Sequence, residues 1–321
     1  MKDAGGIASA GGDGSYPEAL DPSVPIRLSY LAPPPDLEPF VTTFFLFRCD
    51  APLIRDIQPT SLGQVRVYLR GSGRISYPDG RLLSSFPETI QGPTTSAVSF
   101  EMDGPAHMFG AALSALGWGA LTGIPGHRAN DRLLDMRAVL GEGAADFGEA
   151  ARSLYRDDPA MDGEALVERA AAFIRPMLKP VPEAHAAVLR AVPAWLGSGF
   201  NPPLHELHAR CDCSPRQVQR FIRQYYGSSP SHLVRAYRAV RVAALLSEPE
   251  VTDERVAELT EAFYDQPHMI REIRAFVGRT PARLLAESET VLRALVDVRN
   301  FRGIEPGVAP PPPLESEDED A

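Results

Sequence analysis

Hydrophobic and polar residues in the C-terminal third follow the period of an α-helix, and one such pattern occurs twice. Eight positions of the first copy recur 51 residues later. The matched pairs are Ser214 and Asp265, Val218 and Met269, Arg220 and Arg271, Ile222 and Ile273, Arg223 and Arg274, Gly227 and Gly278, Pro230 and Pro281, and Leu233 and Leu284. In each copy a capping residue precedes a helix, a glycine ends it, and a proline begins the next helix. The repeat predicts two copies of one short helical unit.

The first copy predicts a helix with an apolar side and a polar side. At about 100° per residue, Val218, Phe221, Ile222 and Tyr225 cluster in one direction. The opposite side carries the long polar side chains of Arg216, Gln219, Arg220 and Arg223, and Gln217 lies on the flank. A helix that enters a DNA major groove needs an apolar back and long donors in front. A short preceding helix is expected to pack through Leu204, Leu207 and Cys211, which predicts a helix-turn-helix.

The second copy repeats this arrangement with fewer donors. Met269, Ile273 and Phe276 form its back, while Arg271 and Arg274 point forward, His268 lies on the flank, and Gln266 in the first turn either caps the helix or contacts DNA. Pro267 takes the position of Arg216 and cannot donate a hydrogen bond, so we expect less base discrimination here. Arginines on one helix could be merely solvated, but arginines at the same two positions of both copies favour DNA binding.

Between the copies, residues 230–246 have the apolar spacing of a single helix. Seventeen residues span about 26 Å. Leu233, Tyr237 and Val240 are expected to contact both units, together with Ala244 and Leu245. Such a spacer suits two recognition helices placed one DNA turn apart, roughly 34 Å. Two fixed helices on one duplex face would also favour bent DNA.

The stretch "SPRQVQRFIRQYYGSSPSHLVRAYRAVRVAALL" and the later "VAELTEAFYDQPHMIREIRAFVGRTPARL" resemble the DNA-binding domain of AraC/XylS-type transcription regulators. The resemblance covers about 183–286 and implies DNA contact through the second helix of each unit. The matching positions are Arg216, Gln219, Arg220, Gln266, His268 and Arg271. The family's glycine before the second recognition helix is Ala262 here, and a usual alanine of the first unit is His208. We expect His208 to be exposed or to pair with Asp212.

The first half of the chain has strand-like patterns instead. Residues 64–69 alternate, with Val65, Val67 and Leu69 on one face, and turns are expected at 71–73 and 78–80. Apolar runs at 43–47, 97–101 and 107–113 predict further strands. Short helices are expected at 118–121 and 133–140, and longer ones at 144–155 and 163–178. These patterns indicate a small, mostly antiparallel β domain that ends in helices.

The predicted fold is therefore α+β: a β-rich N-terminal domain, then an all-α domain with two helix-turn-helix units joined by a linker helix. We expect a disordered segment at 1–25, a β-rich regulatory, effector or dimerisation domain at 26–180, the AraC-type DNA-binding domain at 183–297, and a disordered, proline-rich acidic tail at 301–321.

The charge of the chain is uneven. The net charge is −10, yet residues 210–241 contain seven arginines and a single acid, Asp212. Phosphate binding depends on the nearby surface more than on the total charge. Arginine also suits forked contacts to guanine and phosphate. The charge pattern therefore agrees with double-stranded DNA as the partner.

Other sites and locations are disfavoured. No apolar run is long enough for a membrane helix and no secretory signal is present, so we expect a cytoplasmic protein. Three cysteines, of which Cys211 and Cys213 flank Asp212, complete no metal site, and only His107 and His127 occur in the first 180 residues. No metal, cofactor or catalytic residue is predicted. The chain lacks a P-loop, a dinucleotide glycine pattern and a nucleophile elbow, and Cys49 has no ligand neighbours.

The sequence thus predicts a transcription regulator, not an enzyme, that is controlled by its N-terminal domain. Trp118, Phe100, Phe109 and Tyr68 either line an effector pocket or form plain core. One alternative is control by a protein partner without a small-molecule effector, and a second is an enzyme domain fused to a DNA reader. RNA polymerase and a second copy of the chain are further candidate partners.

Overall fold

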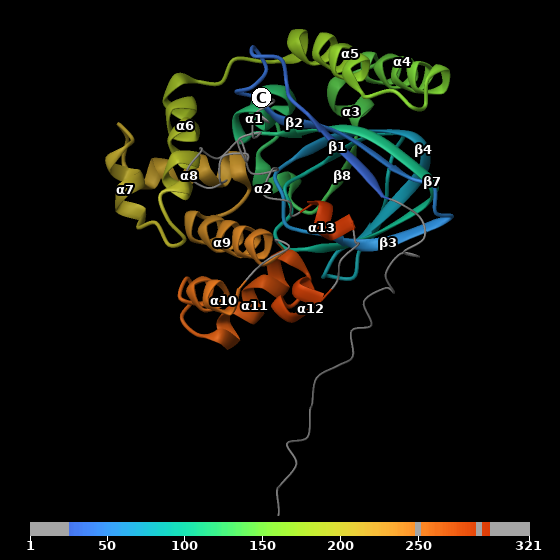
Figure 1. Cartoon of the computed structure of the whole chain (residues 1–321). Helices are drawn as coiled ribbons and strands as arrows, with labels where there is room; N and C mark the ends of the chain where they lie inside the picture. The colour runs from blue at the N-terminus through green and yellow to red at the C-terminus, as the bar shows by residue number, and fades with distance from the viewer. Residues whose placement is uncertain (1–25, 248–251, 287–290, 296–321) are drawn as a thin grey trace, which may run out of the picture.

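The structure is a computed structural model that describes residues 26–247, 252–286 and 291–295. The segments 1–25 and 301–321, for which disorder is predicted, lie outside the described residues. Strands occupy the first part of the described chain and helices the rest (Figure 1), so the predicted α+β class is confirmed. The domain boundaries given above stay predictions.

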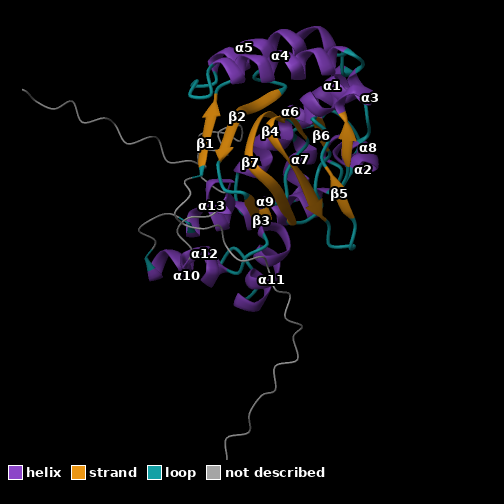
Figure 2. Cartoon of the chain, turned by 90° about the vertical axis from the view of Figure 1, so that its right-hand side faces the viewer, coloured by secondary structure: helices purple, strands orange, loops and turns teal. Residues whose placement is uncertain are grey.

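Eight strands form one sheet, which curves around the centre of the N-terminal part (Figures 1 and 2). They are β1 (Arg27–Leu31), β2 (Val41–Cys49), β3 (Leu53–Gln58), β4 (Gln64–Ser76), β5 (Leu82–Ser84), β6 (Glu88–Gln91), β7 (Val98–Leu113) and β8 (Leu133–Asp135). The order is β1-β2-β7-β4-β6-β8, with β3 paired to β7 and β5 paired to β4. All pairs are antiparallel.

The two faces of the sheet belong to different clusters. On β4, Val65, Val67 and Leu69 pack in a core with the N-terminal helices, as their alternation predicts. The intervening Tyr68 packs on the other face with aromatic residues of β2 such as Phe45. Both faces of this strand are therefore covered. The N-terminal helices pack on one face, and the cluster that contains Tyr68 and Phe45 lies on the other.

Helices of the N-terminal part cover the first of these faces. They are α1 (Ala115–Thr122), α2 (Gly126–Ala129), α3 (Met136–Leu140), α4 (Gly143–Asp157), α5 (Glu164–Ile174) and the short 3-10 turn η1 (Arg175–Met177). Both views place α4 and α5 together at one end of the sheet, opposite α10–α12 (Figures 1 and 2). The buried rings of Phe147 and Phe109 belong to the core that they share with the sheet.

Two local predictions for the N-terminal part are wrong. Residues 71–73 form no turn: β4 continues through them, and Gly71, at φ 74°, absorbs an irregular register opposite β7. The predicted helix 133–140 starts only at Met136, because residues 133–135 pair with β6 as β8. The apolar runs 97–101 and 107–113 lie in strands, as predicted, and both belong to β7. The turn at 78–80 is confirmed by the hydrogen bond from Tyr77 N to Arg81 O.

The remaining helices form the C-terminal part, and we call α6–α12 the reader. Their bounds are α6 (Glu183–Gly197), α7 (Leu204–Ala209), α8 (Pro215–Tyr226), α9 (Pro230–Leu246), α10 (Asp253–Thr260), α11 (Gln266–Val277) and α12 (Pro281–Ala286), followed by α13 (Val291–Leu295). The predicted linker helix 230–246 coincides with α9. No helix in the described part of the chain is long and apolar enough to span a bilayer.

Candidate nucleic-acid interface

Unit 1 consists of α7 and α8, joined by a turn at residues 210–214. Ser214 caps α8 and forms a capping box with Gln217: Gln217 N donates to Ser214 Oγ at 3.4 Å, and Ser214 N donates to Gln217 Oε1 at 3.0 Å. Gly227, at φ 79°, ends the helix in the left-handed conformation. The predicted caps of the first copy are therefore present.

The back of α8 is buried and its front is exposed. Val218, Phe221, Ile222 and Tyr225 lie in a cluster with α6, which contains Trp195. The five predicted contact residues, Arg216, Gln217, Gln219, Arg220 and Arg223, are all exposed. The guanidinium of Arg220 lies 5.1 Å from the ring centre of Phe221, so its stem rests on the helix before it reaches solvent.

Unit 2 consists of α10 and α11 and repeats the same geometry. Asp265 caps α11 by accepting from His268 N at 2.6 Å, and Gly278 ends the helix at φ 89°. Gln266, Arg271 and Arg274 are exposed. The apolar back of the helix is buried, as predicted: Met269, Ile273 and Phe276.

Two residues of α11 depart from the pattern of exposed polar side chains seen in unit 1. The side chain of His268 is 31% exposed and turned inward, with Nε2 3.3 Å from Glu272 Oε1 and its ring against Phe263. Ile270 is 37% exposed and takes the position of Gln219 in the repeat. Ile270 is not among the contact residues predicted from the sequence, although the offset of 51 residues places it on the outward face.

A buried ionic cluster joins α11 to α9, and no sequence pattern predicted it. Glu272 is 1% exposed and forms ion pairs with Arg235, at 2.5 Å, and with Arg238. Arg238 also bonds to Asn201 and lies 4.7 Å from the ring centre of Phe263. Burial alone would raise the pKa of Glu272, but the hydrogen bonds from the two arginines outweigh it and keep the pKa below its usual value. The second recognition helix is thus held by charge as well as by packing.

Comparison with known proteins agrees with this geometry. A family model described as a helix-turn-helix domain matches residues 207–287, which include unit 1 from the middle of α7 onward and all of unit 2. The match identifies this stretch as a helix-turn-helix domain, and the chain is therefore a DNA-binding transcription regulator.

Solved structures with a similar arrangement are distant. ToxT from Vibrio cholerae O395 aligns with 82% of this chain and 97% of its own at 9% identity, with a TM-score of 0.43. The AraC-like transcriptional activator CuxR aligns with 70% of this chain and 84% of its own at 12% identity, with a TM-score of 0.32. Likeness of this degree carries no functional argument. A comparison with curated proteins yields no match.

The C-terminal end of α8 lies directly against the N-terminal part of the chain. Asn130 Nδ2 donates to Gly227 O at 2.8 Å, and His127 Nδ1 lies 3.3 Å from Arg223 O. A methyl group at Gly119 of α1 would lie 2.3 Å from a ring carbon of Tyr225. The absence of a side chain at Gly119 therefore allows α1 and α8 to pack closely.

The C-terminal end of α11 is attached to the same part of the molecule by different contacts. Thr60 N donates to Phe276 O at 2.8 Å, and Ala97 N donates to Ala275 O at 2.9 Å. Arg279, 2% exposed, pairs with the buried Asp56 of β3 at 3.2 Å. Burial raises the pKa of Asp56 despite this partner and the hydrogen bond from Leu292 N. Both recognition helices are thus fixed at their C-terminal ends by the N-terminal part.

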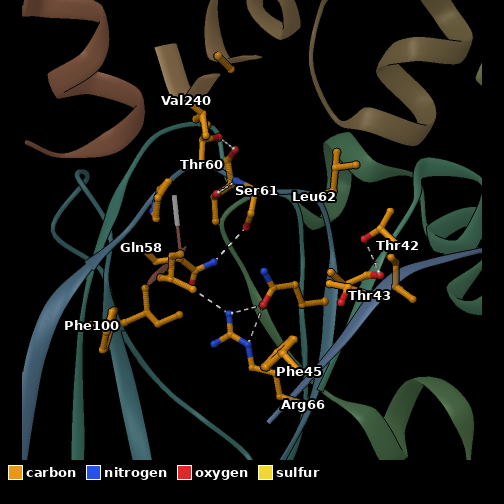
Figure 3. Close-up of a pocket in the computed structure, with 18 of the residues that line it drawn as sticks. Thr42, Thr43, Phe45, Gln58, Thr60, Ser61, Leu62, Arg66, Phe100 and Val240 are labelled. Atoms are coloured by element: carbon orange, nitrogen blue, oxygen red, sulfur yellow. Dashed lines mark hydrogen bonds between the residues drawn. The ribbon is translucent and has the colours of Figure 1, made fainter. Parts of the chain in front are cut away.

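The other residues discussed in the sequence analysis lie in the core, along a cavity or partly exposed at the surface. His208 is half-buried, and its Nε2 atom is buried without a hydrogen bond among the described residues, so neither expectation for it holds. Phe100 and Tyr68 line a cavity of about 360 Å³ between the sheet and the reader (Figure 3), whereas Trp118 and Phe109 belong to the core. Cys49 is buried, and burial raises the pKa of its thiol. Within the described ranges, no three His, Cys, Asp or Glu side chains are placed to hold a metal ion.

Proposed function

We propose that the regulator reads two adjacent major-groove segments of one duplex, with α8 in the first segment and α11 in the second. The observation that carries this proposal is the duplicated geometry: each helix has a buried apolar back and two exposed arginines at equivalent positions. A helix in a major groove needs support from behind and long donors in front. The linker α9, with 17 residues, is about 26 Å long and suits units spaced by about one DNA turn.

In unit 1, we assign base readout to the first turns of α8. Arg216, Gln219 and Arg220 are exposed there, and arginine makes forked contacts to guanine. Arg223 lies further along the helix and suits a phosphate contact. Gln217 is exposed as well, but its amide oxygen already serves the capping box, so we assign it a role in positioning.

In unit 2, we assign fewer direct base contacts. Arg271 and Arg274 supply charge for phosphates or guanine, and Gln266 lies in the first turn. His268 is engaged with Glu272, which leaves it less able to reach a base. Ile270 suits an apolar contact to a thymine methyl group.

We further propose that the N-terminal part controls the reader by setting the relative position of α8 and α11. The hydrogen bonds of Asn130, Thr60 and Ala97 support this role, since they attach the two helices to one β-rich scaffold. The raised pKa of Cys49 disfavours the alternative of a thiolate enzyme, because a buried neutral thiol is a poor nucleophile. Contact with RNA polymerase and pairing of two chains stay predictions.

The test is selection of bound duplexes from a random DNA pool by the full-length protein. We expect enrichment of a two-part motif whose halves lie about one helical turn, ~10 base pairs, apart. Binding of the selected duplex, followed by fluorescence anisotropy, should weaken steeply with salt because phosphate contacts release counterions. Enrichment of a single short motif would contradict the use of both units. A pool without enrichment would contradict sequence-specific reading.

A further inference from the structure

The turn between α10 and α11 carries the most exposed large hydrophobic side chain of the described residues, that of Tyr264. It is 91% exposed, whereas Leu82, the next in order, is 58% exposed. Within the described ranges, neither its ring nor its hydroxyl has a partner in the protein. The turn lies at the end of the molecule opposite α4 and α5 (Figure 1). The phenol of Tyr264 is therefore available to a partner from outside the chain.

A structural role for Tyr264 is conceivable from its position but is not observed. The residue directly precedes the cap Asp265, and an apolar residue there often packs against the fourth residue of the helix, an arrangement called the hydrophobic staple. In α11 the fourth residue is Met269, which is 2% exposed and belongs to the core of unit 2. A side chain as exposed as that of Tyr264 does not take part in this core. It therefore does not fix the start of α11.

Unit 1 shows the structural use of the same position. The offset of 51 residues matches Tyr264 with Cys213, which precedes the cap Ser214. Cys213 is half-buried and packs against the cluster that contains Val218, the fourth residue of α8. The small thiol thus lies against the core of unit 1, while the larger phenol at the equivalent position of unit 2 points into solvent.

The start of α11 has few other groups that could donate a hydrogen bond to DNA. Asp265 is exposed and negatively charged, and Pro267 has no N–H. The side chain of His268 is turned toward Glu272. A helix that enters a major groove passes between two phosphate backbones, and side-chain donors near its first turn hold it there. In residues 264–268, only Tyr264 and Gln266 combine an exposed side chain with a donor group.

We propose that Tyr264 binds the phosphate backbone beside the groove segment occupied by α11. Its hydroxyl donates to a phosphate oxygen, and its ring lies against the neighbouring deoxyribose. Tyrosine is among the side chains that make such contacts in protein–DNA complexes. Its ring is apolar, its tip is polar, and only two side-chain torsions have to be fixed on binding. The inference rests on the proposed function, because it requires α11 to lie in the second groove segment.

The contact would give the two units different tasks. A phosphate is the same at every base pair, so a bond to it fixes the position of a helix without reading sequence. Unit 2 has this contact and fewer donors that could reach bases, since Pro267 and Ile270 take the positions of Arg216 and Gln219. Tyr264 therefore positions α11 on the duplex, while α8 supplies most of the base readout.

The first test compares Tyr264→Phe with the unmodified full-length protein on a duplex selected from the random pool. Loss of one hydrogen bond to a charged phosphate should weaken binding about tenfold. The slope of log affinity against log salt concentration should not change, because a phenol is neutral and releases no counterion, whereas loss of a phosphate-bound arginine lowers the slope by about 0.9. Equal affinities would overturn the proposal, and so would a slope that falls as it does for an arginine.

A second test locates the phosphate. In a series of duplexes, a neutral methylphosphonate replaces one phosphate at a time. At one position beside the second half of the motif, the replacement should cost the unmodified protein about tenfold in affinity and Tyr264→Phe no more than about twofold, because the two changes remove the same bond. Additive losses at every position would show that the hydroxyl contacts no phosphate, which would overturn the proposal.

The matched control is Phe86→Ala, which removes an exposed aromatic ring from the N-terminal part. Phe86 is 37% exposed, and its loss should leave the affinity for DNA unchanged. An equal loss of affinity in Phe86→Ala and Tyr264→Phe would overturn the proposal. Urea unfolding of Tyr264→Phe should match that of the unmodified protein, since the side chain has no packing to lose, and a destabilised variant would instead indicate a structural role. A random pool that yields no two-part motif overturns the proposed function, whereas a two-part motif bound equally well by Tyr264→Phe overturns only this inference.

Discussion

The two units have the same length and the same caps but are held from behind by different chemistry. In both, a 12-residue recognition helix runs from a polar cap to a left-handed glycine. At equivalent positions of the repeat, unit 1 has Phe221 and unit 2 has Glu272. The ring of Phe221 lies 3.9 Å from that of His185, whereas Glu272 pairs with Arg235 and Arg238. The repeat thus preserves the two faces and both ends of the recognition helix. The buried position of Phe221 and Glu272 differs: it holds an aromatic ring in unit 1 and a paired carboxylate in unit 2.

The difference shows what an ionic position requires in a small helical core. A buried carboxylate is tolerated only with well-placed partners. Arg238, Asn201 and Phe263 provide this environment for Glu272, and they come from separate elements. Phe221 needs only apolar neighbours, which any packed helix supplies. Unit 2 should therefore be more sensitive to a single polar substitution and to pH than unit 1.

The largest expected effect is loss of stability on removing either buried side chain. Glu272→Ala leaves the buried Arg238 without its counter-charge, which should cost about 3–5 kcal/mol of unfolding free energy. The half-exposed Arg235 contributes little to this loss because water replaces its partner. Phe221→Ala should cost a similar ~3–5 kcal/mol through lost burial and a cavity. Urea unfolding of the full-length variants, followed by circular dichroism, measures both values.

The pH dependence of the unfolding free energy tests how much of the effect of Glu272→Ala comes from the ion pair. The folded-state pKa of Glu272 lies below its usual 4.5, so its stabilisation is fully present above pH 4.5 and is lost as pH falls through the folded-state pKa. The difference between the unmodified protein and Glu272→Ala should therefore shrink as the pH falls below 4.5. A Glu272→Ala penalty that does not change between pH 7 and pH 3 would show that packing alone is at work.

The next largest effect concerns DNA affinity. Arg220→Ala should weaken binding of a selected duplex by about 1–3 kcal/mol if Arg220 contacts a base. Arg271→Ala should weaken it less, because Pro267 and Ile270 leave unit 2 with fewer donors around that arginine. Anisotropy titrations at one fixed salt concentration compare the two variants. Unchanged affinity of Arg220→Ala would remove this residue from the interface, and a greater loss at Arg271 would reverse the ranking of the units.

The smallest effect concerns the helix caps. Asp265→Ala and Ser214→Ala should each cost about 0.5–2 kcal/mol of unfolding free energy. Asp265 should be the more costly loss, since its carboxylate accepts from His268 N at 2.6 Å, compared with 3.4 Å between Ser214 Oγ and Gln217 N. A negative charge at a helix N-terminus also favours the cap electrostatically. Equal costs would indicate that the capping box of unit 1 compensates for its longer bond.

Much of the reader could be predicted from sequence because its signals are local. The caps Ser214 and Asp265, the terminal Gly227 and Gly278, and helix α9 depend on residues within a few positions of one another. The same holds for the exposure of the arginines, which follows from helical periodicity. That they contact DNA stays a prediction.

Features that depend on distant residues could not be predicted in this way. Glu272 reads as one more charged residue until Arg238 and Asn201 are placed beside it. Arg66 looks like a polar residue of an alternating strand, and its burial on a cavity wall depends on α9 and α13 closing the opposite side. The glycines at 71–73 suggested a turn because a bulge in a paired strand and a turn use the same residues. Only the pairing of this stretch with strand β7 distinguishes a bulge from a turn.

Strand β7 has a mechanical consequence for signalling within the molecule. Immediately before it, Ala97 bonds to the end of α11, and immediately after it, α1 packs on Tyr225 of α8. Between these ends, Phe100, Met102 and Met108 face the cavity. One continuous strand therefore connects the cavity to both recognition helices. A displacement along this strand would reach the two helices together, so we expect the proposed DNA contacts of both units to change together.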